Sequence, residues 1–529
     1  MFLKGFTVFL FSITGWKRQL CVFLCGALTS FALPPFYLTL ISFLTFPIFV
    51  IFLDAINSIQ NTKKRLLTHA ITCGNFGFGY FICGLWWLSN ALLVSPAAFA
   101  WAIPFAIVGP PVYLAFYWFL AGFIISLLWI KGIARFFVLA FALGLAELLR
   151  AILFTGFPWN SLGYTAMPTP MFMQSDAVIG LYGMNILAVL VYSLPAVLLT
   201  NEKKKIALLL CCLLIFIHSS IGFYRLKTAP NIADYQQSRY WVRIVQPSIQ
   251  QQSEQLDYAK QESIFATHIK LSMTPTMPQN KEPDFIVWPE ASIPYILNGT
   301  SAITMRIASF LKPKQWAIVG AIRTNNPSNG QTQYFNTIAV IDSQGNILNA
   351  SDKLHLVPFG EYLPYQSLLS KFGLQALADN VGGYSFATER KTVVMPNNFS
   401  YLPLICYEII FPNEITFNGS SPQAIVNITN DAWFGITPGP YQHFQQAQLR
   451  TIELGIPLIR AANNGISAVI DPYGRIISAL GQNAIGVIDS PIPSHIAPLW
   501  SNKYRIFSTF ILFILMLLCR VSFGSTKQL

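Results

Sequence analysis

The sequence predicts a bundle of about eight transmembrane α-helices joined to an α/β domain outside the membrane. Hydrophobic residues make up 53% of the 529-residue chain and charged residues only 11%, against roughly 25% charged residues in a typical soluble domain. Apolar segments of about 20 residues, the length that crosses a bilayer, recur up to residue 222 and once more near the C-terminus. From about residue 236 to 490 the composition is that of an ordinary α/β domain.

Eight apolar segments are candidate membrane helices. The first is short, but no small-residue cleavage site follows it, so we expect a retained helix and no signal peptide. The fourth is overlong and contains Gly109-Pro110-Pro111, which predicts a kink or a tilt. The segments span residues 19–33, 36–54, 68–88, 99–129, 134–154, 178–200, 205–222 and 505–523.

The basic residues predict the topology. They form small loop clusters in every second connection, whereas the connections near 34–35 and 89–98 carry no charge. Because basic loops stay in the cytoplasm, both termini are predicted inside and residues 223–504 outside, in the periplasm of a bacterium. These clusters form no basic stripe, so the formal net charge of +12 predicts no nucleic-acid partner. The clusters are Lys17 with Arg18, Lys63 to Arg65, Lys131 with Arg135, and Lys203 to Lys205.

The chain is therefore expected to have three parts: residues 1–225 with seven helices, the periplasmic domain at 226–495, and the last helix with a cytoplasmic tail at 496–529. In the periplasmic part, apolar strands alternate with amphipathic stretches, as in α/β folds. About 250 residues suffice for one sizeable core. The clearest strand candidates are WVRIVQ, DFIVWPE, WAIVGAI, NTIAVID and AIVNITND, and the amphipathic stretches include 262–272 and 442–453.

Residues 403–412, PLICYEIIFP, are predicted to form a buried strand with Cys406 and Glu408 on one face. Cys406 is the one cysteine outside the predicted membrane helices. A lone cysteine in an oxidising compartment forms no intradomain disulfide, so it is either buried filler or a nucleophile. The six histidines show no ligand spacing, and no metal site is expected.

Three further candidates lie at the end of a predicted strand or after one. Glu290 closes DFIVWPE, at the carboxyl end of a strand where α/β folds commonly place their sites. Lys353 and Glu361 follow a later strand and a glycine-containing turn. Each of these residues alone is most often a solvated surface group.

Together, Glu290, Lys353 and Cys406 resemble the Glu-Lys-Cys triad of the nitrilase, or carbon-nitrogen hydrolase, superfamily. The flanking motifs are more specific: HLVPFGEYLP, CYEIIFP, NITNDAWFG, QH at 442–443, RAANNGISAVIDPYG and, in the membrane half, GFPWN at 156–160. With these motifs and the helices that flank this domain, nearly the whole chain resembles the apolipoprotein N-acyltransferase family. Family members often carry Lys-Trp where this chain has Glu254-Gln255, and Tyr where it has Ser351.

The resemblance implies a nitrilase-like αββα sandwich in the periplasm, carried by a multi-pass protein of the bacterial inner membrane. It also implies an acyltransferase that takes an acyl chain from a membrane phospholipid. The acceptor is the amine of the S-diacylglyceryl cysteine that begins a diacylated apolipoprotein, and no cofactor is involved.

A thioester route fits these residues, because a thioester is reactive enough for an amine to attack without ATP. Cys406 is the expected nucleophile, and Glu290 the base that later acts as acid. Lys353 and a backbone N–H near Tyr407 are expected to stabilise the oxyanion. Glu361 and Glu408 are expected to hold Lys353 and Glu290 in place.

Two alternatives stay open for the function. A membrane-tethered amidase of the same fold would resolve the thioester with water. A non-catalytic transporter or scaffold is disfavoured, because the triad is intact and the helices show no paired, interrupted halves.

Two segments have competing interpretations. Glu147 and Arg150 lie three residues apart in the fifth apolar segment, directly before GFPWN. Ionisable residues at membrane depth usually have a role, so this region either orients lipid or contains an internal ion pair. Residues 366–386 are either a mobile lid that dips into the outer leaflet or an ordinary core helix.

The topology is testable with reporter fusions placed after residues 60, 95, 203 and 300. The loop charges predict that these fusions read in, out, in and out. A cytoplasmic signal from the fusion at residue 300 would contradict both the topology and a role in lipoprotein maturation.

Overall fold

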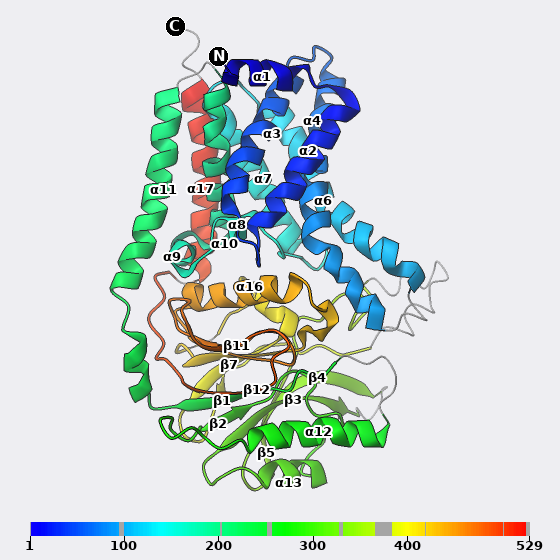
Figure 1. Cartoon of the computed structure of the whole chain (residues 1–529), viewed down its shortest axis with the longest axis vertical. Helices are drawn as coiled ribbons and strands as arrows, with labels where there is room; N and C mark the ends of the chain where they lie inside the picture. The colour runs from blue at the N-terminus through cyan, green and yellow to red at the C-terminus, as the bar shows by residue number, and fades with distance from the viewer. Residues whose placement is uncertain are drawn as a thin grey trace. The chain divides into compact units, whose positions relative to one another are not determined.

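The structure is a computed structural model, and the chain forms two compact units. One unit contains residues 1–229, 437–442 and 498–529, and the other contains residues 230–436 and 443–497. The first is helical and the second is built on β-sheets (Figure 1). The structure describes residues 2–94, 100–200, 204–250, 257–326, 332–364, 383–417, 419–500 and 502–524.

The helical unit contains long apolar helices, and each of the eight predicted segments overlaps a helix of this unit. Among the described residues, six helices are long and apolar enough to cross a membrane, or up to seven if the bent pair Gly5–Ser12 and Gly15–Ala32 is one span. Eight crossings therefore stay a prediction. The helices are α1 (Phe2–Ser12), α2 (Gly15–Thr29), α3 (Ser42–Ile56), α4 (Thr62–Leu85), α6 (Ile103–Leu128), α7 (Ala134–Ile152), α8 (Leu162–Thr165), α9 (Pro170–Met173), α10 (Asp176–Ser193), α11 (Lys204–Lys227) and α17 (Asn502–Gly524).

Glycines allow α2 and α4 to approach closely. Gly26 of α2 faces the carbonyl of Phe76, and Gly79 of α4 faces the carbonyl of Phe23, so that a Cβ at either glycine would collide with backbone. Small residues at such crossings are typical of membrane helices, whose packing depends on close backbone contact.

Glu147 and Arg150 of α7 form an internal ion pair. Their side chains are fully buried, with Nη2 of Arg150 2.7 Å from Oε2 of Glu147. Arg150 also donates to the carbonyl oxygens of Phe157 and Trp159, at 2.5 and 3.0 Å. The structure therefore shows the internal ion pair, and this pair holds the GFPWN segment against α7.

The α/β unit consists of two six-stranded sheets, which confirms the predicted two-sheet α/β fold. Their strand orders are β12-β1-β2-β3-β4-β5 and β11-β10-β9-β8-β7-β6. Strands β1 to β3 pair in parallel, as do β7 to β9. The strands are β1 (Trp241–Gln246), β2 (Phe285–Val287), β3 (Trp316–Asn325), β4 (Gln333–Ile341), β5 (Ile347–Asp352), β6 (Val393–Val394), β7 (Ser400–Ile405), β8 (Ala424–Thr429), β9 (Leu458–Ala462), β10 (Ser467–Ile470), β11 (Ile476–Leu480) and β12 (Gly486–Pro491).

Alternate residues of the first sheet enter two different cores. Val242 and Ile318 contribute to the core shared with the second sheet. Ile286 and Val319 contribute to the core formed with Phe265 of α12 (Tyr258–Ser272) and Ile307 of α13 (Ala302–Ala308). Burial on both faces explains why these strands are continuously apolar in the sequence. A third helix, α16 (Gly439–Leu454), follows β8 in the chain.

The predicted strand at 403–412 is wrong beyond Ile405. Strand β7 ends there, and residues 406–410 form the single turn η8 (Cys406–Ile410). The cause is local, because Oε2 of Glu408 accepts the backbone N–H of Ile405 at 2.7 Å and thus turns the chain back on itself. Cys406 and Glu408 consequently do not share a strand face. The proposed lid falls largely on residues 365–382, outside the described residues, as does Glu254-Gln255.

Candidate active site

Three strand ends of the α/β unit supply the candidate residues. Glu290 follows β2, Lys353 follows β5 and Cys406 follows β7. All three side chains are buried, with exposed fractions of 8%, 1% and 8%. The structure thus places a carboxyl, an ammonium and a thiol in protected positions at strand ends.

Lys353 lies between two carboxylates. Its Nζ donates to Oε1 of Glu361 at 2.8 Å and lies 3.5 Å from Oε1 of Glu290. Asn336 of β4 donates to the same two oxygens, at 2.8 Å to Glu290 and 3.2 Å to Glu361. The backbone N–H of Val357 holds the second oxygen of Glu361 at 2.8 Å. Glu361 therefore supports Lys353 directly, as expected from the sequence.

The surroundings shift the pKa values of both charged groups. Burial raises the pKa of Glu290, against the opposing effect of Lys353. Burial alone would lower the pKa of Lys353, but Glu361, Glu290 and Cys406 outweigh it and raise that pKa. Lys353 is consequently a fixed cation, whereas Glu290 takes up a proton more readily than an exposed glutamate does.

Cys406 begins the turn after β7 with a φ of 51°, in the left-handed region. Burial raises the pKa of its thiol, Glu290 raises it further, and Lys353 opposes both. The resting thiol is therefore protonated at neutral pH. Nucleophilic attack by Cys406 needs a base to remove this proton, and the raised pKa of Glu290 suits that role.

Glu408 connects two of the strand ends. Its Oε1 accepts the backbone N–H groups of Leu354 and His355, at 2.8 and 3.2 Å, while its Oε2 holds Ile405. Arg390 donates to Oε1 as well, at 2.8 Å. Glu408 was expected to hold Lys353 and Glu290 in place. In the structure, its carboxylate instead accepts hydrogen bonds from the backbone after Lys353, from Ile405 and from Arg390. Glu408 therefore holds the backbone next to Lys353.

Tyr407 is buried and packs edge-on against Phe411, with ring centroids 4.9 Å apart. The ring of His355 stacks on Phe411 from another side, at 4.0 Å. These aromatic contacts fix the turn that starts at Cys406.

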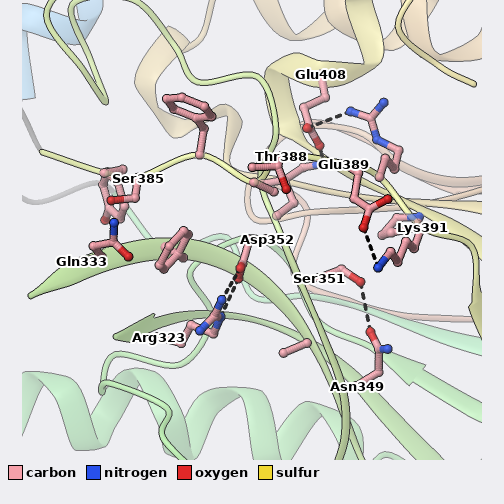
Figure 2. Close-up of a pocket in the computed structure, with 18 residues that line it drawn as sticks. Arg323, Gln333, Asn349, Ser351, Asp352, Ser385, Thr388, Glu389, Lys391 and Glu408 are labelled. Atoms are coloured by element: carbon pink, nitrogen blue, oxygen red, sulfur yellow. Dashed lines mark hydrogen bonds and ion pairs between the residues drawn. The ribbon is translucent and has the colours of Figure 1, made fainter. Parts of the chain in front are cut away.

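A cavity of about 630 Å³ borders the Glu408 side of this turn (Figure 2). The wall contains three ion pairs, Arg390 with Glu408, Arg323 with Asp352 and Lys391 with Glu389. Figure 2 labels Glu408, Arg323, Asp352, Lys391 and Glu389. Glu290, Lys353 and Cys406 do not line this cavity. The cavity therefore lies next to Glu408, which supports the candidate site, but the three candidate residues themselves are not part of its wall.

Sequence reasoning gave no role to several residues near these groups. Asn336 is the first residue of the predicted strand NTIAVID, and the sequence offers no signal for a role there. Asp431, His443 and Arg460 lie within or beside quoted motifs, but their proximity arises only in the fold. Among the described residues, no group of three or more His, Cys, Asp or Glu side chains is arranged to hold a metal ion.

The two-sheet α/β unit is a carbon-nitrogen hydrolase domain within a multi-pass membrane protein. The Carbon-nitrogen hydrolase family model matches residues 242–499. The model of the Apolipoprotein N-acyltransferase N-terminal domain matches residues 25–194.

Curated relatives extend over almost the whole chain. The Apolipoprotein N-acyltransferase of Brucella suis is 44% identical over 514 residues, 96% of each chain. That of Sinorhizobium medicae is 44% identical over 525 residues, 98% of each chain. Among solved structures, an amidase from Nesterenkonia sp. AN1 aligns with 48% of this chain and 94% of its own, at 14% identity and a TM-score of 0.34. The chain belongs to the apolipoprotein N-acyltransferase family, and it is an acyltransferase of lipoprotein biosynthesis.

The raised pKa of Cys406 predicts how fast this thiol reacts in the resting enzyme. Only the thiolate is alkylated readily, so the iodoacetamide rate at Cys406 should rise from neutral pH and keep rising beyond the ordinary thiol pKa of ~8.5. Lys353→Ala should slow the reaction further, since Lys353 lowers the thiol pKa. Peptide mass spectrometry measures the rate at Cys406 separately from other cysteines. A rate that is already constant at neutral pH would show a preformed thiolate and contradict this account.

Proposed function

We propose that the enzyme moves an acyl chain from a membrane phospholipid to the N-terminal amine of an S-diacylglyceryl-cysteine apolipoprotein, through a thioester on Cys406. The observation that carries this proposal is Lys353 held between Glu290 and Glu361. This arrangement supplies a fixed cation beside a carboxyl group that can exchange a proton. The family to which the chain belongs supports lipoprotein N-acylation as the outcome.

In the first half-reaction, Glu290 removes the proton of the Cys406 thiol, and the thiolate attacks the ester carbonyl of the phospholipid. The ammonium of Lys353 stabilises the oxyanion of the tetrahedral intermediate. When this intermediate collapses, the carbon–oxygen bond breaks and Glu290 returns the proton to the departing lysophospholipid oxygen. The enzyme is then an acyl thioester.

In the second half-reaction, the amine of the diacylated cysteine attacks the thioester carbonyl. Glu290 takes the proton that the amine loses as the carbon–nitrogen bond forms, and Lys353 again stabilises the oxyanion. The carbon–sulfur bond breaks, and the proton on Glu290 returns to the sulfur of Cys406. The products are the amide and the free enzyme, so no cofactor is consumed.

The same proposal assigns a place to each part of the chain. Residues 1–225 and 496–529 provide the helices that span the bacterial inner membrane, and residues 226–495 form the catalytic domain in the periplasm. The alternation of basic loop clusters supports this assignment. Both substrates, the phospholipid and the diacylated apolipoprotein, are then drawn from the bilayer. This accounts for a catalytic α/β domain that is attached to so many apolar helices.

Single substitutions test the proposed roles. Glu290→Gln should lower the rate of N-acylation by about 10² to 10⁴, the usual effect of losing a general base. Lys353→Ala should lower it by about 10² to 10³, as the loss of an oxyanion donor does. The assay follows labelled phospholipid into a diacylglyceryl-cysteine peptide, using purified full-length protein.

Cys211→Ala is the matched control, because Cys211 is buried in α11 of the helical unit and should affect the rate little. Near-normal activity in Glu290→Gln or Lys353→Ala would remove that residue from the mechanism. Label that appears as free fatty acid, with none in the peptide, would instead indicate an amidase-like hydrolase.

A further inference from the structure

Three buried charged or titratable side chains adjoin the Cys406 turn without a part in the steps above. Asp431 lies in the turn η9 (Asp431–Phe434), His443 in the first turn of α16 and Arg460 in β9. All three are fully buried, with exposed fractions of 0%. Buried charges are costly unless they are paired and hydrogen-bonded. Their arrangement beside the nucleophile therefore calls for a physical explanation.

The imidazole of His443 bridges Asp431 and the backbone of Cys406. Its Nδ1 lies 2.9 Å from Oδ1 of Asp431, and its Nε2 lies 3.2 Å from the carbonyl oxygen of Cys406. A carbonyl oxygen only accepts hydrogen bonds, so Nε2 carries the proton of that contact. His443 is thus a hydrogen-bond donor to the main chain of the candidate nucleophile.

Arg460 and Asp431 hold the imidazole in this orientation. Nη2 of Arg460 is 3.0 Å from Oδ2 of Asp431 and 3.1 Å from Nδ1 of His443. Although burial opposes ionisation, Arg460 and His443 lower the pKa of Asp431 to about 2. In the neutral ring Nδ1 accepts from Arg460, and in the charged ring Nδ1–H donates to Asp431. The Nε2–H donor to Cys406 is present in both forms.

The Cys406 backbone needs such support. A non-glycine residue in the left-handed region is strained, and it keeps that conformation only where its surroundings enforce it. Glu408 binds the N–H of Ile405 on one side of Cys406, and His443 binds the carbonyl on the other. The two contacts fix the backbone on either side of the residue that carries the thiol.

We propose that His443 is a positioning residue, whose Nε2–H holds the Cys406 carbonyl and so keeps the thiol oriented toward Glu290 and Lys353. Asp431 and Arg460 act through His443 by fixing its ring. This inference rests on the proposed function, because it takes Cys406 as the nucleophile. It adds a hydrogen bond on which productive attack depends.

The test compares His443→Gln, which retains a side-chain N–H near the Nε2 position, with His443→Leu, which has no donor. Misplacement of a reacting group by about 1 Å lowers a rate by about 10²-fold. We expect His443→Leu to lower kcat for N-acylation by about 10²-fold, with KM nearly unchanged. The kcat of His443→Gln should be at least about tenfold higher than that of His443→Leu. Equal kcat values for the two variants would contradict the proposal.

His268 supplies the matched control for losing a buried imidazole. It is buried in α12 of the same unit, and its Nδ1 contacts the carbonyl of Ile264 at 2.9 Å. His268→Leu should lower the melting temperature about as much as His443→Leu does, while leaving kcat close to that of the native enzyme. If kcat falls in both variants in proportion to the loss of melting temperature, the role of His443 is purely structural.

Two further variants keep the outcomes distinct. If His443→Leu does not fold, His443→Asn replaces it, because its shorter amide does not reach the Cys406 carbonyl and its kcat should lie at least about tenfold below that of His443→Gln. Cys406→Ala separates the two proposals. If Cys406→Ala is inactive and His443→Leu has native kcat, only the positioning role fails. If Cys406→Ala is active, the proposed function fails with it.

Discussion

The buried ammonium of Lys353 is the interaction on which the rest of the site depends. With an exposed fraction of 1%, this cation is stable only because Glu361 and Glu290 face it. Removing one partner of such a buried pair typically costs about 3–5 kcal/mol. The ends of β2 and β5 must therefore converge in this geometry for the domain to fold stably. In the proposed mechanism, the contacts that stabilise the fold also provide the electrostatics for acyl transfer.

The two sheets supply the rigidity that this convergence needs. The core between them is formed by apolar residues from both sheets, so the strand ends are fixed by packing as well as by hydrogen bonds. Glu408 then joins the segment after Lys353 to the end of β7. The thiol of Cys406, the carboxyl of Glu290 and the ammonium of Lys353 are in this way held at fixed positions, as the proposed mechanism requires.

The sequence predicted the parts of the structure that depend on local patterns. Continuous apolar runs indicated the long helices and strands such as β1, β3 and β8, because helices in lipid and doubly buried strands leave no polar face. Glu290, Lys353 and Cys406 could be selected because each lies in or at the end of a predicted strand and their order resembles that of a known family. Glu361 was expected to support Lys353, and the structure shows that contact.

Features that depend on side-chain contacts with the backbone or with distant parts of the chain were missed or wrong. Strand β7 ends at Ile405 because the Glu408 side chain captures a backbone N–H, a competition that apolar periodicity does not reveal. Asn336 reaches two carboxylates only after β4 has paired within the sheet. His443 and Arg460 lie 17 residues apart and on different elements, so their shared contact with Asp431 has no signature in sequence spacing.

The most direct test of the central claim is to isolate the acyl-enzyme. Purified protein incubated with phospholipid alone should gain one acyl group on the peptide that contains Cys406, removable by neutral hydroxylamine, because a thioester mechanism needs no acceptor for its first half. Addition of a diacylglyceryl-cysteine peptide should then transfer that group into an amide. If N-acylation proceeds while Cys406 carries no acyl group, the account of Cys406 as the nucleophile is contradicted.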